Sequence, residues 1–105
     1  MHPPPLGFDE VLGHLEADVA ATVGDAHRAI VQKTAALVRE LEIGDPADKV
    51  VDDVQQFIHD TFVDTTWPTC PKHGRHPLWY LSGAWWCEQD DVAIAPLGSL
   101  ARVRE

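Results

Sequence analysis

Positive charge is scarce in this sequence. The 105 residues include 8 Lys and Arg against 17 Asp and Glu, which gives a formal net charge of −9. Residues 1–66 hold four of the basic side chains and thirteen of the acidic ones, whereas residues 67–105 hold four of each. Proteins that bind nucleic acid alone, or dock on anionic membranes, do so through cationic surface. The lack of a basic patch argues against both modes and favours a basic protein as partner.

Long hydrophobic runs are missing as well. The opening MHPPPLGFDE lacks the cationic and apolar segments of a signal peptide, and no stretch approaches the ~20 apolar residues of a membrane span. Cysteine is limited to Cys70 and Cys87. Without an export signal we expect the reducing cytoplasm, where a metal site that uses both cysteines is favoured over a Cys70–Cys87 disulfide.

The first two-thirds of the chain shows helical periodicity. Apolar residues recur mostly at steps of three or four: Leu12, Leu15, Val19, Val23, Ala26, Ile30, Leu37 and Leu41. This spacing predicts one long amphipathic helix over residues 9–42, with its charged residues on a solvated face. Gly24 costs about 1 kcal/mol relative to alanine inside a helix, so the pattern allows a kink or break there.

A second helix is predicted over residues 46–63. Gly44 favours the end of the first helix, and Asp45 as N-cap with Pro46 at the first helical position favours a new start. The two helices form a hairpin in this interpretation. Because two helices alone bury their apolar stripes poorly, we expect them to pack on the C-terminal third, on a second copy in a homodimer, or on both.

The residues that favour metals lie together in the C-terminal third. Cys70, His73 and His76 follow one another as C-x2-H-x2-H, and Cys87 follows after ten intervening residues. Thiolate and imidazole are the ligands that Zn²⁺ prefers in tetrahedral sites. A complete set of four protein ligands leaves no position for water, so we predict a structural zinc that stabilises a small module.

A predicted β-hairpin explains how Cys87 returns to the other three ligands. The segments PLWYL and AWWCE are rich in aromatic residues, as strands are, and Ser82-Gly83 suits a two-residue turn. Counting outward from this turn pairs residues 81 with 84, 80 with 85, 79 with 86 and 78 with 87. Leu78, Tyr80, Trp85 and Cys87 then share one face, while Trp79, Leu81, Ala84 and Trp86 share the other. The sequence leaves open which face meets the helices.

The segment CPKHG resembles the first knuckle of a zinc ribbon, commonly C-P-x-C-G, with His73 in place of the second cysteine. The hairpin and a third strand at residues 92–95 fit that pattern over about residues 67–100. The resemblance implies a second C-x2-C, but Glu88, Gln89 and Asp90 follow Cys87 here. Either His76 or Asp90 is then the fourth ligand, and we prefer His76 because imidazole is the better partner for zinc beside thiolates. The richness in alanine, valine and aspartate also resembles actinobacterial or phage proteins.

The predicted fold class is therefore α+β, with an acidic helical hairpin over residues 1–66 and a zinc-ribbon-like antiparallel β-module with a tail over residues 67–105. We expect a non-catalytic protein-interaction or accessory protein. The alternatives are a nucleic-acid-associated regulator within a complex and a small enzyme with an open zinc site. There is no glycine-rich phosphate loop, G-x-S-x-G or H-E-x-x-H motif.

The remaining histidines are weaker signals. Glu10, His14 and Asp18 are spaced to share one helix face and to bind a metal, but solvated surface residues are the favoured interpretation. We interpret His27 and His59 in the same way. Trp67, before Pro68, is expected to pack between the helices and the β-module.

Overall fold

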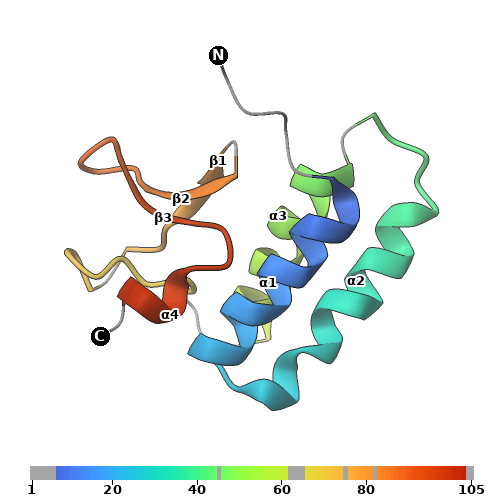
Figure 1. Cartoon of the computed structure of the whole chain (residues 1–105), viewed down its shortest axis with the longest axis horizontal. Coiled ribbons are helices and arrows are strands. Elements are labelled where there is room, and N and C mark those ends of the chain that lie inside the picture. Colours follow the sequence, from blue (N-terminus) through green and yellow to red (C-terminus); the bar gives the residue numbers. More distant parts are fainter. Residues whose placement is uncertain (1–6, 45, 62–65, 75, 82, 104–105) are drawn as a thin grey trace.

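The computed structural model describes residues 7–44, 46–61, 66–74, 76–81 and 83–103. Helices α1, α2 and α3 lie on one side of the molecule, and the small sheet with helix α4 lies on the other (Figure 1). The helices are α1 (Phe8–Thr22), the short 3-10 helix η1 (Asp25–His27), α2 (Ala29–Arg39), α3 (Pro46–Asp60) and α4 (Leu100–Val103). The strands are β1 (Trp79–Leu81), β2 (Ala84–Cys87) and β3 (Val92–Pro96), in the sheet order β1-β2-β3. The predicted α+β class with a C-terminal antiparallel module is confirmed.

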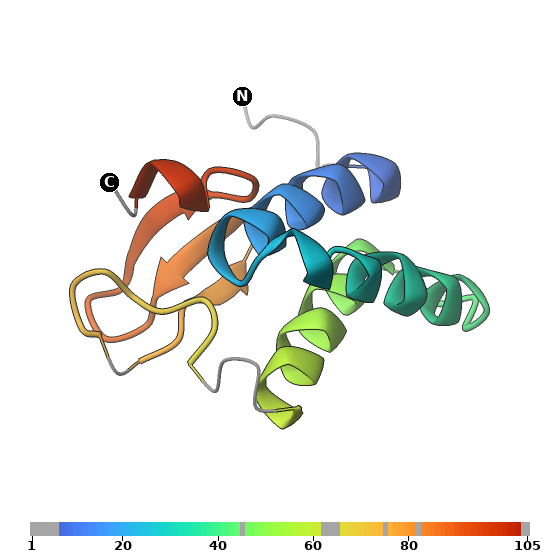
Figure 2. The same ribbon diagram turned by 90° about the horizontal axis from the view of Figure 1, so that it is seen from below.

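The long helix predicted over residues 9–42 is divided in two. Gly24 separates α1 from η1 and α2. Its φ of 109° and ψ of 150° form a backbone conformation that residues other than glycine rarely adopt. The break lets α2 run back antiparallel to α1, with α3 packed against both (Figures 1 and 2). Three helices therefore replace the predicted hairpin. The predicted apolar stripe is buried at Leu12, Leu15 and Val19 of α1, but its continuation through Leu37 and Leu41 is wrong. After the break at Gly24, α2 turns another face to the core and buries Val31, Ala35 and Val38.

The second helix that the sequence predicts corresponds to α3. It begins at Pro46, as predicted, and ends at Asp60. Its proposed N-cap, Asp45, and the last two residues of the predicted range lie outside the described residues. No helix in the described ranges is long and apolar enough to cross a bilayer.

The predicted hairpin register is confirmed for the three pairs that the structure contains. Trp79 pairs with Trp86, Tyr80 with Trp85, and Leu81 with Ala84. Ser82 of the predicted turn lies outside the described residues, and its neighbour Gly83 has a φ of 86°. The third strand also forms, antiparallel to β2, with a register shift between Trp85 and Trp86.

One hydrophobic core joins the helices to the sheet. Its buried members come from every helix except η1 and from the C-terminal third: Val11, Leu12, Leu15, Val19, Val31, Ala35, Val38, Val50, Val51, Val54, Ile58, Trp67, Cys70, Leu78, Trp85, Cys87, Ala95, Leu97 and Leu100. The face of the hairpin with Leu78, Trp85 and Cys87 is therefore the core face, whereas Trp79 and Leu81 on the opposite face are exposed. Both cysteines thus belong to the same core as the helices.

Candidate metal centre

The segment before β1 folds back on itself and brings the ends of a loop together. An isolated antiparallel bridge joins Thr69 to Pro77, and the Cys70 N–H donates to the His76 carbonyl at 2.9 Å. Just outside the bridge, the Leu78 N–H donates to the Pro68 carbonyl at 2.6 Å. The described residues 70–74 and 76 therefore belong to a closed loop that begins with Cys70 and carries His73 within it.

Cys87 reaches this loop from the far end of β2. It pairs with Val92 across the β2–β3 turn, and it lies at the end of the strand whose register with β1 the sequence predicts. The segment of residues 66–74 and the β2–β3 turn lie next to each other at the end of the molecule away from α2 (Figure 2). Two segments that are distant in sequence thereby converge.

Three of the four predicted ligands come together. One ligand atom from each of Cys70, His73 and Cys87 lies within 4.8 Å of the other two. Both cysteines are free thiols and are 1% and 2% exposed, while His73 is half-buried. Atoms bound to one tetrahedral zinc lie about 3.3–3.8 Å apart, because zinc–ligand bonds are about 2.0–2.3 Å long. Small side-chain movements would therefore fit this group around a metal ion.

Asp90, the alternative fourth ligand, contacts His73 instead of completing that group. Its Oδ2 lies 3.1 Å from His73 Nε2 and 3.8 Å from Lys72 Nζ. A carboxylate beside the second ring nitrogen of a metal-binding histidine fixes the tautomer and orientation of the ring. The position of Asp90 suits that role.

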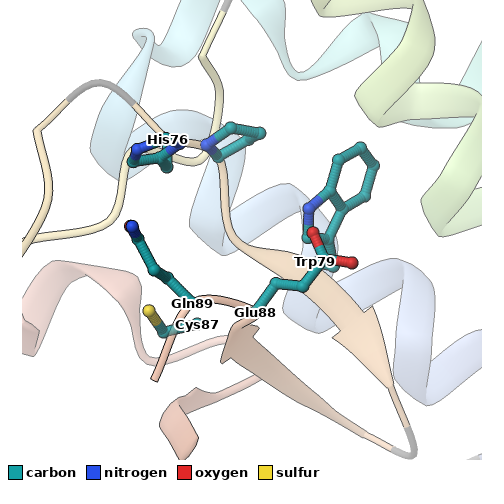
Figure 3. Close-up of a pocket in the computed structure, with 6 residues that line it drawn as sticks. His76, Trp79, Cys87, Glu88 and Gln89 are labelled. Atoms are coloured by element: carbon teal, nitrogen blue, oxygen red, sulfur yellow. The ribbon is translucent and has the colours of Figure 1, made fainter. Parts of the chain in front are cut away.

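The structure leaves His76 outside the three-residue group. Its side chain is exposed, and its ring centroid lies 6.1 Å from that of His73. Its carbonyl is held by the Cys70 N–H, so its backbone is next to the site although its ring is not within it. Figure 3 shows the His76 ring across a gap from Cys87, with Gln89 between them.

That gap is a surface pocket of about 320 Å³ beside the metal group. Its lining comes from the segment that leads into β1 and from the end of β2: His76, Pro77, Trp79, Cys87, Glu88 and Gln89. Cys87 is therefore shared between the metal group and the pocket wall.

Aromatic side chains attach both ligand-bearing segments to the helices. Trp67 and Trp85 pack edge to face with ring centroids 5.4 Å apart, and both are buried. Trp67 Nε1 donates to Thr22 Oγ1 at 2.7 Å, which ties the start of the loop to α1. The expectation that Trp67 packs between helices and sheet is confirmed.

Two polar side chains of the helices complete this attachment, and the sequence interpretation missed both. Gln55 Nε2 donates to the Leu78 carbonyl at 2.7 Å and to the Trp67 carbonyl at 3.2 Å. The same Trp67 carbonyl lies 2.6 Å from His59 Nε2, so the interpretation of His59 as a purely solvated residue is wrong.

Asp18 is likewise not the solvated residue that the sequence suggested. Its side chain is 0% exposed and accepts hydrogen bonds from Trp85 Nε1 at 2.8 Å, the Gly98 N–H at 2.7 Å and the Leu100 N–H at 3.0 Å. Burial raises the pKa of Asp18 above its ordinary value, while these three donors act in the opposite direction. The spacing of Val11, Leu15 and Asp18 at i, i+4 and i+7 was the signal, because it places Asp18 on the buried stripe.

The alternative metal site on α1 does not form. Both carboxylate oxygens of Asp18 are taken by N–H donors, and Glu10 and His14 are exposed. Within the part of the chain that the structure describes, the group able to hold a metal is that of Cys70, His73 and Cys87.

Fold and site together define a small α+β protein with a Cys2His group able to hold a metal ion. Comparison with protein-family models, curated proteins and solved structures finds no match to this chain.

Proposed function

We propose that this protein binds one structural Zn²⁺ through Cys70, His73, Cys87 and a fourth ligand, His76. The observation that supports the proposal is the convergence of two thiols and one imidazole to within 4.8 Å. Two thiolates balance the charge of Zn²⁺, and neutral imidazoles complete the shell without adding charge. In a reducing compartment such as the cytoplasm the thiols stay available as ligands.

His76 remains the preferred fourth ligand over Asp90. Its backbone is already held next to Cys70 by a hydrogen bond, which keeps the ring close to the site. Asp90 is engaged with His73 Nε2 and Lys72, which leaves His73 Nδ1 as the nitrogen for the metal. In this proposal Asp90 orients His73 from outside the coordination shell.

The proposed role is that of a non-catalytic interaction or accessory protein. A closed shell of four protein ligands has no position for a substrate or water. The net charge of −9 suits a basic protein partner and disfavours direct contact with nucleic acid, although docking within a larger nucleoprotein complex fits the same zinc module. Leu37 of α2 and Leu41, just beyond the end of this helix, are exposed apolar residues through which two copies of the protein would associate. Sedimentation would measure the mass of the resulting dimer.

An open zinc site is the second candidate, and the pocket beside Cys87 favours it. If His76 stays in its exposed position, the metal keeps a free coordination position next to a pocket of about 320 Å³. A three-ligand zinc with bound water is the arrangement of hydrolytic enzymes.

Metal analysis and X-ray absorption on the purified protein decide between these functions. We expect one zinc per chain with two sulfur and two nitrogen neighbours. His76→Ala should replace one nitrogen with water oxygen, whereas Asp90→Asn should keep the shell and lower zinc affinity by about tenfold. His27→Ala, which changes a histidine of η1, is the matched control and should change neither the coordination shell nor the zinc affinity. An ordered water in the wild-type shell would support the enzyme, and a metal-free protein would contradict both functions.

A further inference from the structure

The pocket beside Cys87 has an aromatic wall and a carboxylate. Trp79 is 44% exposed, although tryptophan usually buries its large ring, and it lines the pocket together with Glu88. The two residues share the outer face of the hairpin because Trp79 pairs with Trp86, and Glu88 follows two residues after Trp86. Figure 3 shows the Glu88 side chain extending toward Trp79.

Charge around the pocket favours a cation. The β2–β3 turn carries Glu88, Asp90 and Asp91, all exposed. Asp90 already contacts Lys72 and His73, whereas Glu88 lies at the pocket. A cation placed over a tryptophan ring is attracted by the negative face of the ring, and a carboxylate beside it adds a charge-assisted hydrogen bond.

We infer that this pocket binds an arginine or lysine side chain of a basic protein segment. The long side chain lies along Trp79, and its charged end meets Glu88. The inference deepens the proposed interaction function and rests on it, since it places the contact with a basic partner on the outer face of the hairpin. Cys87 couples the pocket to the metal, because the residue that lines one also belongs to the other.

The experiment uses the zinc-loaded full chain and two synthetic peptides. One is a hexapeptide rich in arginine, and the other replaces each arginine with citrulline, which keeps the shape and removes the charge. Binding is followed by NMR through the indole N–H signals of the 4 tryptophans. We expect the arginine peptide to shift the Trp79 signal saturably, to leave the buried Trp67 and Trp85 signals in place, and the citrulline peptide to shift none.

Variants test the two residues separately. Trp79→Leu and Glu88→Gln should each weaken arginine-peptide binding by on the order of three- to tenfold. Glu10→Gln, which removes the same charge from the first turn of α1, should leave the affinity within twofold. Unchanged Trp67 and Trp85 signals and unchanged zinc content will show that each variant is folded.

Three results would overturn the inference: no Trp79 shift at millimolar arginine peptide, an equal shift with citrulline, or equal weakening by Glu10→Gln and Glu88→Gln. The two proposals fail separately. A protein that binds zinc but not the peptide contradicts the cation pocket alone, and one that binds the peptide without any metal contradicts the structural zinc alone.

Discussion

Asp18 is a charged residue in a fully buried position. A carboxylate that is fully buried loses its hydration, and here three N–H donors from Trp85, Gly98 and Leu100 replace the water. These donors belong to β2 and to the turn that starts α4. One side chain of α1 therefore holds the strand that carries Cys87 and the C-terminal helix.

Asp18→Asn is expected to destabilise the fold by about 1–3 kcal/mol, because the amide NH2 would face N–H donors and leave at least one of them without a partner. Urea unfolding of the zinc-loaded proteins measures the difference in free energy of unfolding. Glu16→Gln, a change of the same kind on the same helix, is the control and should cost less than half as much, since Glu16 is not fully buried. Equal costs would contradict this role of Asp18.

Wild type and Asp18→Asn also test the raised pKa of Asp18. A carboxyl with a higher pKa in the folded state binds its proton more tightly there than in the unfolded chain. Its contribution to the free energy of unfolding is therefore largest below the unfolded pKa and falls as pH rises through the folded pKa. The stability difference between wild type and Asp18→Asn should shrink over that range. A difference that grows instead would mean that the three donors outweigh burial.

At the scale of elements, Gly24 determines how the helices are arranged. The residues on either side of it have helical periodicity, and the sequence is compatible with one long helix. The left-handed φ of 109° instead ends α1 and turns the chain toward α2. A residue with a side chain would be strained in that conformation.

Gly24→Ala is accordingly expected to lower the free energy of unfolding by about 1–3 kcal/mol, although alanine is the better helix former. Gly13→Ala, in the middle of α1, should raise it by about 1 kcal/mol, because apart from its chain neighbours and the surrounding helix backbone no atom lies within 4 Å of the added Cβ. Thermal unfolding followed by far-UV circular dichroism compares the two. Stabilisation by both substitutions would show that the break at Gly24 is not required.

Across the whole molecule, the candidate metal site and the helical core are continuous. Cys70 and Cys87 are core residues, and Trp67 and Trp85 next to them contact α1 through Thr22 and Asp18. A metal that joins the two cysteines would therefore stabilise the packing of the sheet on the helices as well as the loop itself.

Removal of the metal by a chelator, or the substitution Cys87→Ser, is expected to change the near-UV circular dichroism of the tryptophans strongly while most of the far-UV helical signal survives. The reason is that the helices also pack on one another, whereas the buried Trp67 and Trp85 belong to the two segments that the metal would join. His27→Ala serves as the control for the substitution. If chelation leaves the near-UV signal unchanged, the metal does not hold this part of the fold.

The sequence by itself determined features that depend on local spacing: the buried stripe of α1 at Leu12, Leu15 and Val19, the start of α3 at Pro46, the pairing of β1 with β2, and the concentration of Cys70, His73 and Cys87 near one hairpin. Periodicity and turn chemistry act between neighbours in the chain, so they can be seen without a structure. Tertiary structure decided the rest. It placed the Cys87 face of the hairpin inward, buried Asp18 against three donors, left the His76 ring outside the group, and opened the pocket that Trp79 and Glu88 help to line. Those outcomes depend on which surfaces meet across the core, and residues up to 82 positions apart, such as Asp18 and Leu100, meet there.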